Sequence, residues 1–177
     1  MSKNRVQGST SLLLIVVAVS TSHGCHSKEL SLNQTSNRGR ADGPLNLLDK
    51  AARFELLSLD PTFHADKAGG GNEYFHGFRI LGRLRVENAD KDAIAAALRN
   101  GVDESDGIEP GCALEPRHGI RVTDGEGTTD FLICFKCGQV VVLVGSTEST
   151  SFLTTASPRK SFNAALGKSG IPIAPSD

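Results

Sequence analysis

The sequence predicts a small α+β domain, with a mostly antiparallel sheet of about five strands and two or three helices. Two observations predict this class. Short runs that alternate apolar and polar residues follow one another without the regular strand–helix alternation of a parallel sheet. Between them, residues 88–100 carry every signal of a helix. We divide the chain into a signal peptide (residues 1–24), a flexible tether (25–43) and a single domain (44–177).

The first 24 residues have the three parts of a secretory signal peptide. Lys3 and Arg5 supply the positive region, residues 12–19 are apolar without interruption, and small polar residues follow. A run of eight apolar residues is too short to cross a membrane, which takes about 20 helical residues. No later segment supplies such a run, so we expect an exported protein with no transmembrane helix in the mature chain.

Cys25 stands at the end of this signal. Gly24-Cys25 resembles the processing box of bacterial lipoproteins, in which the cysteine is lipidated and becomes the first residue of the mature chain. Ser22 and His23 depart from that box, which prefers an aliphatic residue at the position of Ser22. Two locations therefore stay open: the cell envelope, with a lipid anchor on Cys25, or secretion after ordinary cleavage.

Residues 25–43 predict a flexible tether. They contain few large apolar side chains and no hydrophobic period. Such a segment cannot bury enough surface to offset the entropy of ordering. We expect it to link the folded domain to the membrane face.

The first half of the domain predicts a hairpin followed by a helix. Residues 54–60 end against a proline and predict a strand, and residues 78–86 alternate apolar with basic side chains, as a half-exposed strand does. A flexible connection with three consecutive glycines separates the two strands. The helix at 88–100 has a capping asparagine, early acids and a following glycine. Its apolar stripe, which includes Ile94 and Leu98, is expected to lie on the sheet.

The second half predicts three strands and a last helix. Residues 119–123 and 129–134 flank an Asp-Gly turn and predict a hairpin, and the valine-rich run 139–144 predicts a buried strand. The serine- and threonine-rich segment that follows predicts an irregular loop or a ragged edge strand. A short helix over residues 157–168, with a proline near its start, closes the domain.

Three cysteines and one histidine of the domain are candidate metal ligands. Cys112, Cys134, Cys137 and His118 offer three thiolates and one imidazole, the composition of a closed structural zinc site. The Cys-x-x-Cys-Gly motif also stands at the turn between two predicted strands, like the metal-binding knuckle of zinc ribbons, in which the glycine permits the tight turn. Zinc is therefore the candidate cofactor.

Two alternatives to zinc stay open for the same cysteines. In an oxidising compartment, Cys112 is expected to form a disulfide with Cys134 or Cys137, closing a loop worth about 3–4 kcal/mol. A redox-active pair of Cys134 and Cys137 is the second alternative. It is disfavoured by the strand pattern after the motif, because thioredoxin-like sites begin a helix whose positive end lowers the pKa of the first thiol.

Arg117 and His118 form the other concentrated polar group, just before a predicted strand. A guanidinium and an imidazole can both contact an anion, so these two residues are candidate ligand contacts. No second carboxylate or nucleophile stands at a diagnostic spacing, and no catalytic residue is predicted. The net charge of −1 shows no basic footprint for a nucleic acid. We expect a binding or structural module rather than an enzyme.

Two motifs in the second half of the domain resemble motifs of a known group of proteins. PRHG (residues 116–119) and ICFKC (133–137), with the hairpin, the valine-rich strand and the closing GIPIAP, resemble an uncharacterised group of small exported bacterial proteins. The resemblance covers residues 45–174 and implies no particular activity. The sequence thus predicts an exported binding or structural module at a bacterial membrane face. The alternative function is an extracytoplasmic thiol–disulfide redox protein that uses Cys134 and Cys137.

Overall fold

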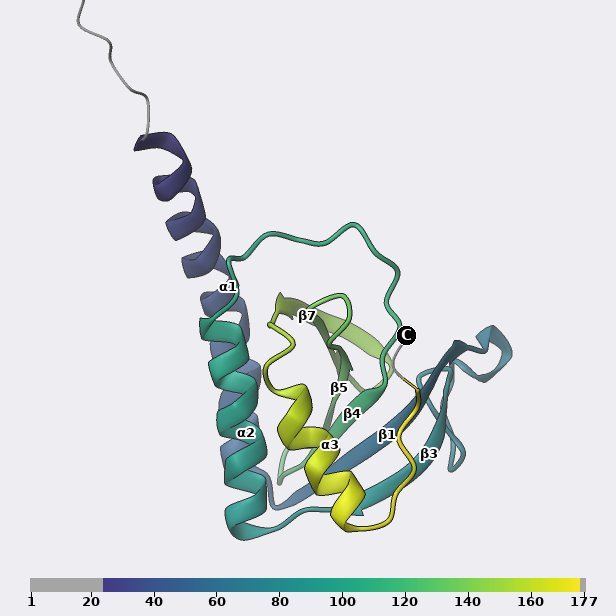
Figure 1. Ribbon diagram of the computed structural model, residues 1–177. Helices are drawn as coiled ribbons and strands as arrows, with labels where there is room; N and C mark the ends of the chain where they lie inside the picture. The colour runs from purple at the N-terminus through teal and green to yellow at the C-terminus, as the bar shows by residue number, and fades with distance from the viewer. Residues whose placement is uncertain (1–23, 176–177) are drawn as a thin grey trace, which may run out of the picture.

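The protein, seen in a computed structural model, is described over residues 24–175. In that range seven strands form one curled antiparallel sheet, and three α-helices pack on it (Figure 1). The elements in chain order are α1 (Gly24–Lys50), β1 (Arg53–Phe63), the 3-10 helix η1 (Ala65–Lys67), β2 (Tyr74–Phe75), β3 (Phe78–Arg85), α2 (Asn88–Asp103), β4 (His118–Thr123), β5 (Thr128–Cys134), β6 (Gln139–Val144), β7 (Thr147–Leu153) and α3 (Arg159–Lys168). The predicted signal peptide lies, except for its last residue, outside the described residues.

The α+β class, the antiparallel sheet and the single small domain are confirmed. The predicted number of about five strands was too low for the part of the chain that is described. β2 has only two residues, and β7 is rich in serine and threonine. Neither strand carries the apolar alternation by which a strand is recognised in a sequence.

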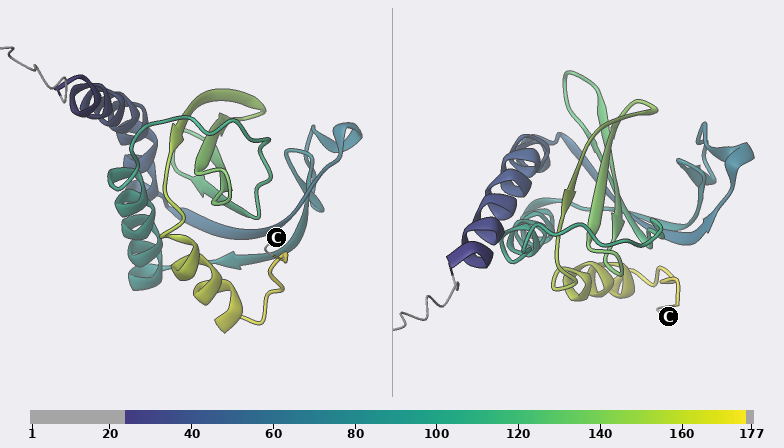
Figure 2. Two further views of the ribbon diagram at one scale, coloured as in Figure 1. Left: turned by 45° about the horizontal axis from the view of Figure 1, so that its top comes forward. Right: turned by 90° about the horizontal axis from the view of Figure 1, so that it is seen from above.

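The strand order across the sheet is β2-β3-β1-β4-β5-β6-β7, and all neighbouring strands are antiparallel. β1 joins two groups of strands, because it pairs with β3 on one side and with β4 on the other. The two views in Figure 2 show that the sheet is strongly curled and that the helices lie on its outer side.

Alternation along the strands divides the sheet into two faces. Leu56, Ile120 and Phe131 belong to the larger core, which they form with apolar side chains of α1, α2 and α3. Leu57 and Leu132 point to the opposite face and form a smaller core with residues of β2, β3 and β6. The face that carries the larger core also carries the candidate site described below.

Two element ends differ from the prediction. β1 does not end before Pro61 but continues to Phe63, and its pairing with β3 shifts register in that stretch. Proline is tolerated there because the regular ladder, to which it cannot donate, is interrupted. α2 continues past Gly101, which was predicted to lie beyond the helix. A Cβ at Gly101 would lie 2.5 Å from Cγ of Pro158, so glycine is needed for close packing against the start of α3.

The predicted tether over residues 25–43 is wrong, because the structure places these residues in α1. Asn37, Ala41, Leu45 and Leu48 are buried, and their spacing of three to four residues puts them on one helix face. The prediction failed because it counted large apolar side chains, whereas an asparagine and an alanine make the first two buried contacts. None of the helices described is both long and apolar enough to span a membrane.

Asn37 fixes α1 to the edge of the sheet. Its side chain is fully buried, and the N–H of Leu153 in β7 donates to Oδ1 of Asn37 at 2.6 Å. Nδ2 of Asn37 donates in turn to the carbonyl oxygen of Leu153 at 3.1 Å. The amide therefore pairs with β7 as a neighbouring strand would, and it satisfies two backbone groups of an edge strand.

Asn37→Ala is expected to lower the free energy of unfolding by about 2–3 kcal/mol, because it leaves two buried backbone groups of Leu153 without partners. Ser36→Ala, at an exposed position of the same helix, should change it by less than about 0.5 kcal/mol. Urea denaturation of both variants measures the difference. Equal stability of the two variants would mean that α1 does not dock through Asn37 in solution.

Candidate anion-binding site

Four segments line a cavity of about 340 Å³. They are the start of β4, the β5–β6 turn, α3 and the tail after α3. The polar side chains of the wall are Glu115, Arg117, His118, Lys136, Arg159 and Asn163, and the apolar ones are Phe135, Ile173 and Ala174. The structure therefore places both predicted ligand contacts, Arg117 and His118, on the wall of one cavity.

His118 is the buried part of this wall. It is only 2% exposed, and its ring packs against Phe135 and Phe162 with centroid distances of 5.2 and 5.6 Å. Its Nε2 atom lies 2.7 Å from Oδ1 of Asn163. A carbonyl oxygen can only accept a hydrogen bond. Nε2 of His118 therefore carries the ring proton and donates a hydrogen bond to Oδ1 of Asn163.

The imidazole of His118 is uncharged at neutral pH. Burial lowers the pKa of His118 to about 4. The hydrogen bond to Asn163 raises the pKa, and the positive charges of Arg159 and Arg117 lower it further. A neutral ring with its proton on Nε2 presents Nδ1 as an acceptor. Nδ1 is buried and has no hydrogen-bond partner among the described residues.

Ser58 carries a second buried polar atom, Oγ, that also lacks a partner in the described part of the chain. Ser58 is fully buried and stands directly opposite His118 in the pairing of β1 with β4. Side chains opposite each other in antiparallel strands point to the same face of the sheet. The two unpaired atoms thus belong to neighbouring side chains. The sequence alone could have pointed to Ser58, because it is a polar residue among apolar ones in a predicted strand.

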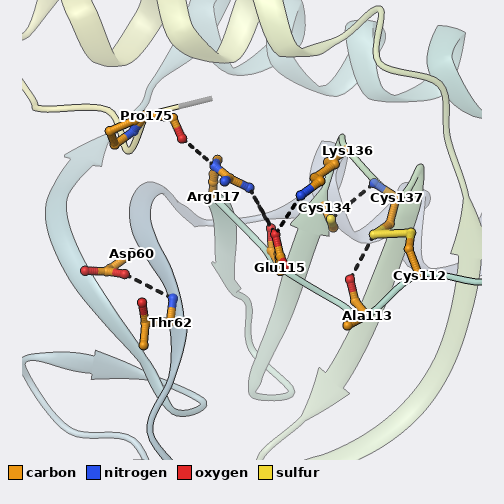
Figure 3. A network of polar contacts seen from close by, with 10 residues as sticks. All are labelled: Asp60, Thr62, Cys112, Ala113, Glu115, Arg117, Cys134, Lys136, Cys137 and Pro175. Atoms are coloured by element: carbon orange, nitrogen blue, oxygen red, sulfur yellow. Dashed lines mark hydrogen bonds and ion pairs between the residues drawn. A yellow bond between two sulfur atoms is a disulfide. The ribbon is translucent and has the colours of Figure 1, made fainter. Parts of the chain in front are cut away.

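Three cations and one carboxylate surround the cavity, so that it has two net positive charges while His118 is neutral. Nζ of Lys136 lies 3.2 Å from Oε2 of Glu115, and Nη1 of Arg117 lies 3.9 Å from the same atom (Figure 3). Nε of Arg117 donates to the carbonyl oxygen of Pro175 at 2.7 Å. With Arg159, these groups can hold an anion, and the aromatic and aliphatic parts of the wall can contact an apolar body.

Sequence reasoning missed the contribution of α3 to the site. Arg159 and Asn163 lie four residues apart in that helix, and this spacing places them on one face. The spacing is visible in the sequence. Nothing local shows that this face meets His118, because the contact depends on how α3 packs on the sheet.

A disulfide lies beside the cavity. Cys112 and Cys137 are bonded, with 6.0 Å between their Cα atoms, and join the connection before β4 to the β5–β6 turn. Cys134 keeps a free thiol that is buried, and its Sγ accepts a hydrogen bond from the N–H of Cys137 at 3.3 Å (Figure 3). Of the pairings left open by the sequence, the structure therefore has the one between Cys112 and Cys137.

The zinc alternative does not fit this arrangement. Cys112 and Cys137 are bonded to each other and offer no thiolate, and Nε2 of His118 is taken by Asn163. Within residues 24–175, no group of three or more His, Cys, Asp or Glu side chains is placed to hold a metal ion. The arrangement does not support a site with three thiolates and one imidazole, and spacing along the chain could not show that two of the sulfurs face each other.

Two further cysteine predictions concern the Cys134–Cys137 pair and Cys25. Cys137 is bonded to Cys112 rather than to Cys134, and the strand β6 follows the motif, so the arrangement is not that of a thioredoxin-like pair. Cys25, the predicted lipidation site, falls at the start of α1, and its side chain lies outside the described part of the protein.

A second polar cluster lies on the opposite face of the sheet. Arg121 donates to both carboxylate oxygens of Asp130 at 2.8 and 2.7 Å, and Nε2 of His76 is 2.7 Å from one of them. Burial would raise the pKa of Asp130, but the hydrogen bonds from Arg121 and His76 outweigh it and lower the pKa. Both oxygens of Asp130 are satisfied within the protein, so we interpret this cluster as structural.

Comparison of the chain with protein-family models, with curated proteins and with solved structures gives no match. A functional inference therefore rests on the chemistry of the cavity. That chemistry consists of a buried neutral imidazole, one carboxylate and three cations at the wall.

Replacing His118 with leucine is expected to remove a pH dependence of stability. The pKa of His118 is about 4 in the folded protein and about 6.5 in the unfolded chain. Between these values the unfolded state binds more protons. The contribution of the neutral His118 to the free energy of unfolding is therefore complete above about pH 6.5. It falls as the pH drops and is lost by about pH 4.

Between about pH 7 and about pH 5, the wild type should lose about 2 kcal/mol more free energy of unfolding than His118→Leu. Urea denaturation at a series of pH values measures this difference. His64→Gln, at a partly exposed histidine, should keep the wild-type dependence. Parallel pH profiles for the wild type and His118→Leu would contradict a buried, neutral imidazole.

Proposed function

We propose that the protein is an exported bacterial binding module whose cavity takes a small organic anion. The observation that carries this proposal is the composition of the cavity wall, where the buried His118 lies beside Arg117, Lys136 and Arg159. The three cations attract a negatively charged group, and the ring of Phe135 offers contact to an apolar one.

The size of the cavity limits the ligand. A volume of about 340 Å³ is at the lower end of the range of about 300–1,000 Å³ that is typical of small-molecule sites. A carboxylate or phosphate joined to an apolar group about as large as one ring matches this volume and this charge. We therefore propose a monoanion of low molecular mass rather than a polymer.

Binding is favoured over catalysis. Ser58, His118 and Asn163 have the residue types of a nucleophile, a base and an orienting group. However, Oγ of Ser58 is fully enclosed, and within the described residues it has no hydrogen bond to His118. A histidine whose pKa is about 4 is also a weak base at neutral pH. Both observations disfavour a catalytic role for these residues.

Export is proposed from the signal pattern in residues 1–24, and the resemblance to small exported bacterial proteins agrees with it. The disulfide between Cys112 and Cys137 supports it, because disulfides persist in oxidising compartments. A lipid on Cys25 would attach the protein by the outer end of α1 (Figure 1). Twelve residues, or about 18 Å of helix, separate Cys25 from the buried Asn37, so α1 would act as a spacer above the membrane.

Benzoate is the first probe, because it joins a carboxylate to one apolar ring. Isothermal titration calorimetry should show that benzoate binds and that its neutral isostere benzamide binds at least about five-fold more weakly. Arg159→Gln should weaken benzoate several-fold, and Lys160→Gln should not, because the side chain of Lys160 is outside the cavity wall. Equal binding of the two probes, or equal effects of the two substitutions, would argue against an anion site.

Cys25→Ser tests the lipid anchor. If Cys25 is lipidated, the substitution should move the protein from the membrane fraction to the soluble extracytoplasmic fraction of expressing cells. Immunoblotting of the two fractions measures the change, with Ser27→Ala as a neighbouring control. An unchanged partition would leave plain secretion as the location.

A further inference from the structure

Arg159 is the cation of the cavity wall that has no carboxylate partner among the described residues. Lys136 and Arg117 both lie close to Glu115, with a nitrogen 3.2 and 3.9 Å from the same carboxylate oxygen. The charge of Glu115 therefore offsets part of theirs. Arg159 is exposed at the surface as well as at the cavity, so its guanidinium is available to an anion that enters from solvent.

Asn163 presents a second donor, one helical turn further along α3. Its Oδ1 accepts the proton of Nε2 of His118 at 2.7 Å, so the oxygen end of the amide is turned toward the buried ring. The other end, Nδ2, carries two N–H donors. Nδ2 makes no hydrogen bond within the described residues, and it is open to solvent rather than enclosed, unlike Nδ1 of His118. Nδ2 is therefore the atom of the amide that remains for a ligand.

The helix brings these two donors to one place. Residues four apart lie on the same face of a helix, with about 5–6 Å between their Cβ atoms. Helical side chains also incline toward the N-terminal end of their helix, so Asn163 leans toward Arg159. A guanidinium and an amide N–H at this spacing can bind the two oxygens of one carboxylate. The apolar side chains of Phe135 and Ile173, on the same wall, can contact the body of the ligand.

His118 determines which end of the Asn163 amide meets the ligand. The two ends of an amide have nearly the same size and opposite hydrogen-bonding character. A turned amide would present a carbonyl oxygen to the ligand, and that oxygen repels an anion. In the turned orientation Nδ2 would also meet the N–H of Nε2, donor against donor. The proton on Nε2 of His118 therefore holds the amide in the orientation that suits an anion.

We propose that Arg159 and Asn163 together bind the anionic group of the ligand, and that His118 is a positioning residue that orients the Asn163 amide. The inference rests on the proposed function and assigns the anion to one part of the cavity wall. His118 does not touch the anion in this arrangement. It acts through the bond between its Nε2 and Oδ1 of Asn163.

Asn163→Asp tests the donor. It exchanges the N–H₂ group for an oxygen of similar size and keeps an acceptor for Nε2 of His118. Isothermal titration calorimetry on the mature chain at about pH 8 should show benzoate weakened at least ten-fold, because a charged oxygen replaces a donor. Benzamide should keep its affinity, because its own N–H₂ group can donate to the new oxygen. Asn100→Asp is the control: it adds the same charge at an exposed position of α2, away from the cavity wall, and should change neither affinity.

His118→Leu and His118→Gln test the positioning role. Leucine has no N–H to hold Oδ1 of Asn163, so the amide can turn and accept a hydrogen bond from benzamide. The preference for benzoate over benzamide should fall from at least about five-fold to about two-fold or less. Glutamine carries an N–H₂ group near the position of Nε2 and should retain the preference. A loss of packing alone would weaken both probes and leave the preference unchanged.

The possible failures can be told apart. If the wild type binds benzoate no better than benzamide, the proposed function is wrong and this inference falls with it. If the wild type prefers benzoate but Asn163→Asp weakens both probes equally, or neither, the anion binds elsewhere on the wall and only this inference is overturned. A preference that survives His118→Leu overturns it as well, because Asn163 would then keep its orientation without the ring. Should Asn163→Asp fail to fold, shown by the loss of a cooperative melting transition, the two His118 variants decide the outcome.

Discussion

The antiparallel pairing of β1 with β4 is the contact on which the rest of the structure depends. Six residue pairs, from Arg53 with Thr123 to Ser58 with His118, join strands that α2 and a long connection separate in the sequence. The pairing unites the group β2, β3 and β1 with the consecutive strands β4 to β7 into one sheet. Without it, each group would have an additional unpaired edge. A shift of this register by one residue would also turn His118 away from α3, because successive side chains point to opposite faces.

Burial of His118 sets the protonation state of the cavity wall. The ring lies among Phe135 and Phe162, which are themselves 5.2 Å apart and exclude water from one side of the imidazole. Aromatic contacts of this kind are worth about 0.5–1.5 kcal/mol each, and the bond to Asn163 satisfies one nitrogen. The cost of a buried charge then decides the protonation state. A neutral imidazole therefore stands on the same cavity wall as three cations that stay charged.

The disulfide between Cys112 and Cys137 stabilises the loop and the turn beside the cavity. The connection between α2 and β4 contains no helix or strand, and Cys112 lies within it. Its bond to Cys137 closes a segment of 25 residues, which is worth about 3–4 kcal/mol in the chain-entropy account. The bond also keeps Glu115 close to Lys136, two side chains of the cavity wall.

Elements with local sequence signals could be predicted before the fold was known. The alternation in β3, the apolar stripe of α2 and the buried run of β6 were all predicted close to their observed places, because each pattern is complete within about ten residues. The predicted caps of α2 were wrong: Asn88 and Gly101 both lie inside the helix, which is flanked by Glu87 and Glu104. The adjacency of Arg117 and His118, and their role as candidate ligand contacts, were also legible. These features needed no knowledge of what packs against them.

Other roles depend on contacts between residues that are distant in the chain. Asn37 reads as a tether residue until its amide meets β7, and Ser58 reads as a minor polar interruption until the register places it beside His118. The choice of Cys137 as the partner of Cys112, and the convergence of Arg159 and Asn163 on the cavity, likewise depend on residues that are distant in the chain. The physical reason is common to all four cases: a polar side chain acquires its role from the groups that surround it, and folding rather than sequence spacing brings those groups together.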